Sequence, residues 1–322
     1  MAKTRDHDIQ LLAIGELLVD LISTQTTDSL ATVKSFERHQ GGSPANIAVN
    51  IARLGGTSAL MANVGDDAFG AFLKQSLAHA GVITDYITLD PDAHTSVVFV
   101  ARTKGTPDFL PMREADLHLG AVSSHGGISL LDAIHRTEAV HVSSWPLRRD
   151  PARSFAHEAL RRAMAAGKLT SLDPNYSPQL WPDRHEALDV LQSVLRDVAI
   201  VKPSLDDAAR LFGQRLAPDE IVERFHTMGP ATVILTMGKE GTLLSESGTL
   251  HRIPGRKIEV ADATGAGDAF WSGFLLAKLE GLTTRHAAYV AREIAERKLQ
   301  TVGPLPGNLD RKAIYQRAGS YL

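Results

Sequence analysis

An alternation of short apolar runs with longer stretches of helical spacing constrains this chain more than any other feature of its sequence. The apolar runs predict buried strands at residues 9–15, 58–65, 138–144, 168–174, 198–202 and 231–238. The longer stretches predict helices at residues 43–56, 67–81, 150–167, 204–213 and after Gly265. Repeated βαβ units place parallel strands in one sheet and helices on its faces. The pattern therefore predicts an α/β fold with a mainly parallel central sheet.

Two segments break this alternation. Residues 17–37 and 96–113 show strand-like alternation without an intervening helix. We expect them to pair with each other outside the main sheet as a small β lid, although ordinary edge strands would give the same pattern. The predicted domains are then a core of residues 1–16, 38–95 and 114–322, and a lid of residues 17–37 and 96–113.

Composition excludes several classes of function. The chain has no cysteine, which removes disulfides, thiolate metal sites and cysteine nucleophiles together. Its net charge of -3 argues against a nucleic-acid partner, and no apolar run approaches the ~20 residues that cross a membrane. The start of the chain, MAKTRDHDIQ, lacks the apolar core of a signal peptide, so we expect a cytoplasmic protein.

The stretch DATGAGD, residues 262–268, lies between a strand-like segment and an apolar helix. A helix start leaves backbone N–H groups unpaired and attracts anions, and Gly265 and Gly267 let the backbone approach one closely. The two glycines could instead make only a tight turn, with Asp268 complementing the helix dipole. A carboxylate beside a phosphate is unfavourable unless it binds a metal or accepts a proton. The combination therefore suggests phosphoryl transfer with Asp268 as general base.

These seven residues closely resemble the carboxy-terminal signature of the ribokinase-like (PfkB) family of carbohydrate and nucleoside kinases. GGSPANIAVNIARLGG, residues 41–56, is similar to the family's amino-terminal motif, and VGDDAFG follows it. The resemblance implies a three-layer sandwich with a small β-sheet lid, and use of ATP and Mg²⁺. It also implies a homodimer formed through the lid, and it leaves open whether a monovalent cation such as K⁺ is needed.

The resemblance also implies roles for individual residues. Asp268 matches the catalytic base, and the amides of Gly265, Ala266 and Gly267 match the anion hole. The positions that match sugar contacts are Asp20, Gly42 and Asn46, and Gly41 with Gly42 matches the hinge of the lid. Asp20 could otherwise close a turn, and Asn46 could cap or pack.

Two further stretches match the nucleotide side of the family's site. ILTMGKEG makes Thr236, Gly238 and Gly241 candidates for the ATP site, although the two glycines could form a plain hairpin turn. KPSLDDAARLF starts at Lys202, which we assign with Ser204 to nucleotide binding. The family often has N-x-x-E here. Ser204 and Asp207 stand in its place, so we expect Asp207 to reach magnesium through water.

The substrate is indicated by subgroup features. Gly15 with Glu16, and the small residue Ser43, are typical of members that act on fructose or 2-keto-3-deoxygluconate. DPNYSPQLWPD is similar to a fructokinase stretch and makes Asn175 a substrate contact, but Ser177 replaces an arginine and Met112 a tyrosine of that subgroup.

A fructokinase-like enzyme is the leading hypothesis. For a keto-acid substrate, Arg102 and Arg113 of the lid could bind the carboxylate, although exposed arginines are more often only solvated. A ribose or nucleoside kinase stays open. A sugar or nucleotide sensor without catalysis is the alternative from a different class.

Overall fold

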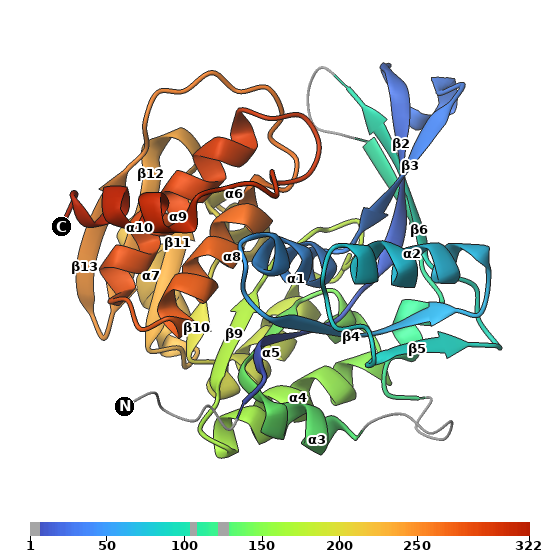
Figure 1. Ribbon diagram of the computed structural model, residues 1–322, viewed down its shortest axis with the longest axis horizontal. Coiled ribbons are helices and arrows are strands. Elements are labelled where there is room, and N and C mark those ends of the chain that lie inside the picture. The colour runs from blue at the N-terminus through green and yellow to red at the C-terminus, as the bar shows by residue number, and fades with distance from the viewer. Residues whose placement is uncertain (1–6, 104–107, 122–128) are drawn as a thin grey trace.

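The computed structural model describes residues 7–103, 108–121 and 129–322. Its larger sheet has nine strands in the order β13-β12-β11-β10-β9-β8-β1-β4-β5 (Figure 1). All neighbouring strands from β11 to β5 are parallel, and β12 and β13 continue the sheet antiparallel. The strands are β1 (Ile9–Ile14), β4 (Ser58–Gly65), β5 (Ile87–Asp90), β8 (Thr137–Ser143), β9 (Leu169–Asp173), β10 (Ile200–Val201), β11 (Thr232–Thr236), β12 (Gly241–Glu246) and β13 (Thr249–Pro254).

Alternate residues of each buried strand face opposite layers of helices. In β1, Leu12 and Ile14 pack into the core on one face, and Leu11 and Ala13 pack on the other. The first face is covered by α3 (Leu130–Arg136), α4 (Ala152–Ala165), α5 (Arg184–Val194), α6 (Leu205–Phe212) and α7 (Pro218–Thr227). The second face is covered by α1 (Ser43–Arg53), α2 (Ala68–His79), α8 (Ala266–Leu279), α9 (Thr284–Leu299) and α10 (Arg311–Gly319). The predicted α/β sandwich with a mainly parallel sheet is confirmed.

Helix α8 is closely packed in the second helical layer. Trp271 is fully buried, and its ring stacks on that of Phe274 with 5.1 Å between the ring centroids. A Cβ on Gly273 would lie 2.6 Å from Cδ1 of Ile294, so glycine is needed for the close approach of α8 to α9. This packing fixes the first turn of α8, where the DATGAGD motif ends.

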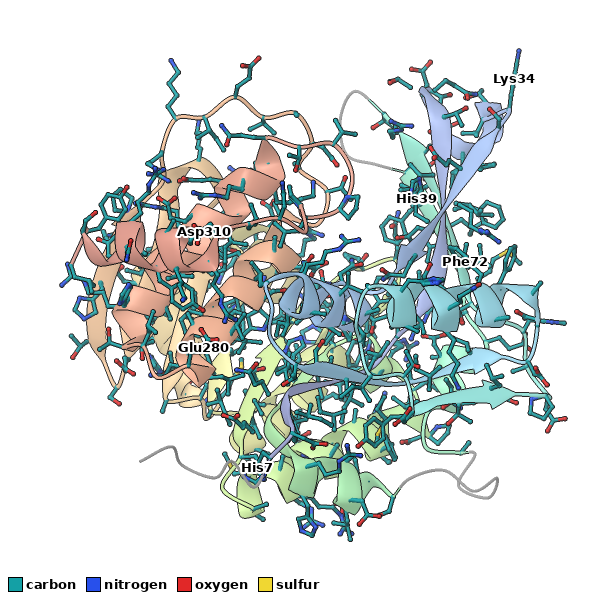
Figure 2. All side chains as sticks on the ribbon, in the orientation of Figure 1. His7, Lys34, His39, Phe72, Glu280 and Asp310 are labelled. Atoms are coloured by element: carbon teal, nitrogen blue, oxygen red, sulfur yellow. The ribbon has the colours of Figure 1, made fainter. Side chains whose placement is uncertain are left out.

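The two segments that break the alternation do pair with each other. Strands β2 (Leu18–Thr26), β3 (Phe36–Gly41), β6 (Val97–Arg102) and β7 (Asp108–Met112) form a second sheet in the order β3-β2-β6-β7, in which β2 and β6 are parallel. Figure 2 shows His39 on β3, Lys34 in the segment just before β3, and Phe72 on α2 beneath the sheet. The guanidinium carbon of Arg38 lies 3.7 Å from the centre of the Phe72 ring, which ties the sheet to α2.

The division of the chain into core and lid domains stays a prediction. Residues 1–6, 104–107 and 122–128 of the predicted domains lie outside the described residues. None of the helices in the described part of the chain combines the length and the apolar character that a membrane span requires.

Candidate active site

Polar residues lie together at the carboxyl ends of the parallel strands of the large sheet. In an open parallel sheet, ligands bind beyond the carboxyl ends of the strands. Here those ends supply Glu16 after β1, Ser143 of β8, Asp173 of β9, Lys202 after β10 and Thr236 of β11. The DATGAGD loop and the start of α1 meet at the same edge, because Ser43 and Asn46 bond to Asp268.

The loop before α8 presents an open helix start. Gly265 is the N-cap and has a left-handed backbone with φ of 73°. Across the described residues, the backbone N–H groups of Gly265, Gly267 and Asp268 have no hydrogen-bond partner, whereas the Ala266 amide donates to the Ala263 carbonyl at 3.2 Å. Of the three amides predicted for an anion hole, those of Gly265 and Gly267 are thus free and that of Ala266 is engaged, while the Asp268 amide is also free. Anion binding by these amides stays a prediction.

Asp268 sits in the first turn of α8 and is held from both sides by α1. Ser43 Oγ donates to its Oδ1 at 2.8 Å, and Asn46 Nδ2 donates to its Oδ2 at 2.9 Å. Burial raises the pKa of Asp268 above its ordinary value, although these two hydrogen bonds and the Lys202 charge oppose the rise. A carboxylate with a raised pKa at an open helix start can accept a proton from a bound hydroxyl.

Asp20 on β2 is the second carboxylate of the site. Burial and the charge of Asp268 raise the pKa of Asp20 to about 7. A Cβ on Gly41 would lie 2.3 Å from Asp20 Oδ2, so glycine is needed where β3 passes the carboxylate. Gly42 adopts φ of 101°, and a Cβ there would lie 2.3 Å from the Glu16 carbonyl oxygen. The predicted sugar contacts Asp20, Gly42 and Asn46, and Gly41 of the predicted hinge, therefore lie close to Asp268.

Glu16 links the start of α1 to the end of β8 through two hydrogen bonds. Its side chain is buried, Oε1 accepts a hydrogen bond from the Ser43 amide at 3.1 Å, and Oε2 accepts one from Ser143 Oγ at 2.7 Å. Burial raises the pKa of Glu16 to about 7. From the sequence, Glu16 and Ser43 are predicted only as features of a substrate subgroup. Their hydrogen-bonded link from Ser143 to Asp268 depends on β8 lying beside β1, which local sequence does not show.

A buried ion pair lies on the other side of the anion loop. Lys202 Nζ is 2.7 Å from Asp173 Oδ2, and both side chains are 5% exposed. A Cβ on Gly267 would lie 3.7 Å from Lys202 Nζ, which places the ammonium beside the free amides. Burial lowers the pKa of Lys202, but the charge and hydrogen bond of Asp173 outweigh burial and raise it overall. Lys202 is among the residues predicted from the sequence, and Asp173 is not, although a carboxylate at the end of a buried strand is a local signal for such a position.

Ser204 and Asp207 form a capping box at the start of α6. Ser204 Oγ donates to Asp207 Oδ2 at 2.7 Å, and the Asp207 amide donates to Ser204 Oγ at 3.0 Å. In the part of the chain that the structure describes, Oδ1 of Asp207 has no hydrogen-bond partner. The charge of Asp207 also acts on Lys202. One open carboxylate oxygen near the anion loop fits a water-mediated contact to Mg²⁺.

The other predicted nucleotide residues lie at the β11 end. The Thr236 amide donates to the Pro203 carbonyl at 3.0 Å, which places Thr236 beside the Lys202–Ser204 segment. Gly238 and Gly241, with φ of 56° and 95°, bound a short 3-10 turn (Gly238–Glu240) between β11 and β12. The hairpin turn that the sequence allowed for these glycines is thus present. No hydrogen bond among the described residues joins them to Asp268.

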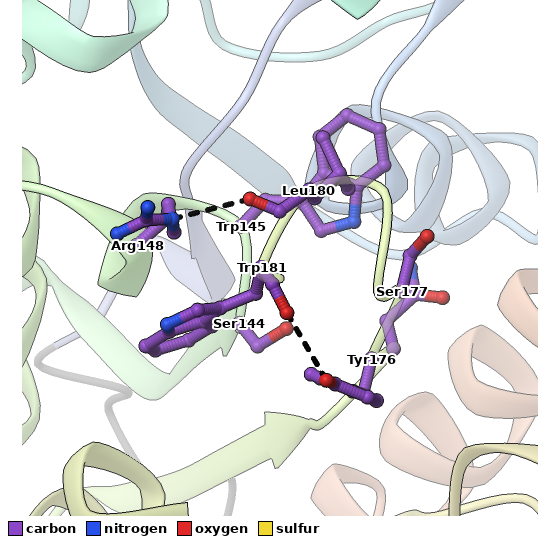
Figure 3. A pocket seen from close by; sticks show the side chains of 8 residues that line it. Ser144, Trp145, Arg148, Tyr176, Ser177, Leu180 and Trp181 are labelled. Atoms are coloured by element: carbon purple, nitrogen blue, oxygen red, sulfur yellow. Dashed lines mark hydrogen bonds between the residues drawn. The ribbon is translucent and has the colours of Figure 1, made fainter. Parts of the chain in front are cut away.

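Asn175 lines a small pocket beside the ion pair. Its backbone takes φ of 38°, and its backbone N–H donates a hydrogen bond to Asp173 Oδ1 at 3.2 Å. Figure 3 shows the pocket, in which Arg148 Nε donates to the Leu180 carbonyl and Tyr176 Oη to the Trp181 carbonyl. The remaining lining residues are Ser144, Trp145 and Ser177.

The two lid arginines are both engaged with protein groups. Arg113 Nε donates to the buried Asp116 at 2.8 Å, and its guanidinium also bonds to the carbonyl of Trp145, which lines the small pocket. Arg102 Nε donates to the Ser23 carbonyl at 2.8 Å within the second sheet. The structure brings Arg113 to the rim of the pocket and leaves Arg102 exposed on the sheet.

Three comparisons place this geometry among known proteins. The profile of pfkB family carbohydrate kinases matches residues 8–310. The chain is 35% identical over 300 residues to the ATP-dependent 6-phosphofructokinase of Thermoanaerobacterium thermosaccharolyticum, covering 93% of this chain and 91% of that one. Its fold matches the fructokinase of Halothermothrix orenii with a TM-score of 0.78 and 38% identity, over 92% and 99% of the two chains.

A sugar kinase of Pyrococcus horikoshii, solved in complex with ATP, also matches the fold with a TM-score of 0.81 and 30% identity, over 96% of this chain and 99% of that one. The match of the family profile across nearly the whole chain agrees with the two motifs and with the free amides beside Asp268. On this evidence, the chain belongs to the pfkB family of carbohydrate kinases, enzymes that transfer a phosphoryl group to a sugar hydroxyl.

Proposed function

We propose that the protein is an ATP-dependent kinase that phosphorylates a terminal hydroxyl of fructose. The observation that carries the proposal is the position of Asp268, a half-buried carboxylate beside three free amides at the start of α8 and within reach of the sugar-side residues of α1. A binding protein would need the amides but would have no use for a base with a raised pKa beside them.

The chemistry follows from the charges around this carboxylate. Asp268 accepts the proton of the attacking sugar hydroxyl as its oxygen forms a bond to the γ-phosphorus, and the bond from that phosphorus to the bridging oxygen of ADP breaks. The free amides of Gly265, Gly267 and Asp268 and the Lys202 ammonium lie where negative charge increases on the transferred group. Ser43 and Asn46 orient the base before the reaction.

Mg²⁺ and ATP complete the proposed site. Bound Mg²⁺ neutralises charge on the phosphates. In this chain Asp207 would hold it through water, since Oδ2 is engaged in the capping box and Oδ1 is open among the described residues. Lys202, Ser204, Thr236, Gly238 and Gly241 would bind the nucleotide, and Asn175 with Asp20 and Asn46 would contact the sugar.

Fructose is favoured by the likeness to the Halothermothrix orenii fructokinase and by Glu16 and Ser43, which together hold the start of α1 against Asp268. A second candidate is fructose 6-phosphate, because a relative that is 35% identical is a 6-phosphofructokinase. That substrate would place a second phosphate away from the reacting hydroxyl, where Arg148 and Arg113 lie near the small pocket.

ADP release across a panel of acceptors tests the proposal. Fructose, fructose 6-phosphate, 2-keto-3-deoxygluconate, ribose and a nucleoside would each be incubated with ATP and Mg²⁺. We expect the highest kcat/KM with fructose. A higher value with fructose 6-phosphate would move the assignment to the second candidate, and binding of a sugar without turnover of any acceptor would favour a sensor. The homodimer through the lid and the cytoplasmic location stay predictions.

A further inference from the structure

Lys298 carries a buried ammonium that the proposed reaction does not use. It lies in the last turn of α9, its side chain is 4% exposed, and its Nζ is 3.2 Å from Asp262 Oδ2. Nζ also lies 3.4 Å from the Asp262 carbonyl oxygen and 3.3 Å from the Thr301 carbonyl oxygen. A lysine is rarely buried unless its charge is compensated. Here one carboxylate and two carbonyl oxygens compensate it.

The oxygens that surround this ammonium belong to the base of the anion loop. Asp262 is the first residue of DATGAGD, and its Oδ1 accepts a hydrogen bond from the Thr264 amide at 2.9 Å. Its Oδ2 also accepts one from the Gly303 amide at 3.3 Å, and its own amide donates to the Leu299 carbonyl at 3.2 Å. Asp262 thus joins the anion loop to the end of α9, and Lys298 is the cation at that junction.

The lysine also reaches the loop directly. A Cβ on Gly265 would lie 3.9 Å from Lys298 Cε, so the stem of the side chain lies under the residue that caps α8. Gly265 provides one of the three free amides. The ammonium therefore does two things for the loop: it fixes the Asp262 carbonyl and carboxylate, and it adds a positive charge behind amides that face an anion.

The oxygen atoms around the Lys298 ammonium are of the kind that bind a monovalent cation. Two carbonyl oxygens and a carboxylate oxygen are hard oxygen ligands, which bind alkali cations and ammonium alike. We propose that the Lys298 ammonium is a built-in monovalent cation for the anion loop, so that phosphoryl transfer by this chain needs no added K⁺. Lys298 is a positioning residue in this proposal, which rests on the proposed kinase function.

The first test compares salts. Wild-type protein, assayed with Tris salts of ATP and with MgCl₂, should turn over equally fast in KCl and in N-methylglucamine chloride at matched ionic strength. Lys298→Ala removes the ammonium and leaves room for an ion. Its kcat should fall roughly tenfold or more in N-methylglucamine chloride, and KCl or NH₄Cl should restore most of the loss. Lys298→Met fills the space without charge, so its kcat should be low in all three salts.

A matched control lies at the end of α8. Lys278 Nζ donates to Thr284 Oγ1 at 2.7 Å and lies 3.9 Å from Glu246, away from the anion loop. Lys278→Ala should therefore show no response to the choice of cation. Stimulation of the wild type severalfold by KCl would overturn the proposal, and so would full activity of Lys298→Met or a loss in Lys298→Ala that no cation restores.

A melting experiment separates this inference from the kinase assignment. Because the cation would bind the loop without any turnover, KCl and NH₄Cl should raise the Tm of Lys298→Ala above its value in N-methylglucamine chloride, while the wild-type Tm stays the same in all three salts. This readout holds even if no sugar of the panel is phosphorylated. A Tm of Lys298→Ala that is identical in the three salts would contradict a cation site at Asp262 and Thr301.

Discussion

The Ser43 hydroxyl donates a 2.8 Å hydrogen bond to Oδ1 of Asp268, a residue 225 positions further along the chain. Asn46 bonds the other oxygen of the same carboxylate. The two sequence motifs that are farthest apart thus meet at one side chain. In the proposed reaction a sugar hydroxyl would share or replace one of these hydrogen bonds, so α1 would determine how the proposed base meets its substrate.

Replacing the base should separate catalysis from binding. Asp268→Asn keeps the shape of the side chain and can still bond to Ser43 and Asn46, but it cannot accept the sugar proton. We expect kcat to fall by roughly 10²–10⁴-fold, with a small change in the KM of the sugar. Steady-state kinetics of this variant and of Asp219→Asn, an exposed carboxylate paired with Arg252, provide the comparison. Near-normal turnover of Asp268→Asn would reject Asp268 as the base.

Removing one hydrogen bond from the base should shift the pH dependence of the reaction. The hydrogen bonds from Asn46 and Ser43 lower the pKa of Asp268, whereas burial raises it. Ser43→Ala therefore raises this pKa further, and the acidic limb of the kcat profile should move to higher pH. The pH–rate profiles of wild type and variant measure the shift directly. An unchanged or lower apparent pKa would show that Ser43 does not act on the base.

An added methyl group should block the anion loop without harming the fold. A Cβ on Gly267 would meet only Lys202 Nζ, at 3.7 Å, and an alanine in the first turn of α8 is favourable for the helix. Gly267→Ala should leave Tm unchanged or higher, and it should lower kcat/KM for ATP by roughly tenfold or more because the methyl occupies the space between the amides and the ammonium. Gly307→Ala, with no atom within 4 Å of its added Cβ, is the control.

The Asp20 carboxylate should lower the free energy of unfolding at neutral pH. Its pKa is about 7 in the folded protein against an ordinary 3.8, so the folded state binds the proton more tightly. The stability that protonated Asp20 gives below pH 4 is lost as pH rises towards 7. Asp20→Asn should therefore melt higher than wild type at pH 8, by roughly 2–6 °C, and the difference should vanish near pH 4. The same variant should raise the sugar KM. A lower Tm at pH 8 would contradict the raised pKa.

The core and the open helix start before Asp268 could be predicted from the sequence because both are local signals, and the role of Asp268 as base stays a prediction. The apolar runs of β1 and β4 predict strands of a buried sheet, and the two glycines followed by Asp268 predict an open helix start. Glu16 and Asp173 were not predicted as site residues, because their partners Ser143 and Lys202 come from strands whose neighbours are fixed only by the order of the sheet. The antiparallel β12–β13 edge was also not predicted, since the alternation describes only βαβ units.

The burial of Lys298, on a helix, could likewise not be predicted from the local sequence. In the sequence it stands among charged residues at the end of an amphipathic helix, which is where exposed lysines are common. Its burial follows from the return of the chain at Thr301 and from the Asp262 carbonyl, neither of which a helical period reveals. The burial of this charged residue is determined by contacts made after the helix ends.

The tryptophans give this site a spectroscopic signal of its own. The chain has three of them, and Trp145 and Trp181 line the small pocket beside Asn175. Trp271 follows Asp268 by three positions on α8, and its indole N–H donates to the buried His141 at 3.2 Å. Since tryptophan emission, excited selectively near its red edge, would come only from these three residues, ligand binding at the proposed sugar and phosphate sites should be measurable by intrinsic fluorescence, without a label and without turnover.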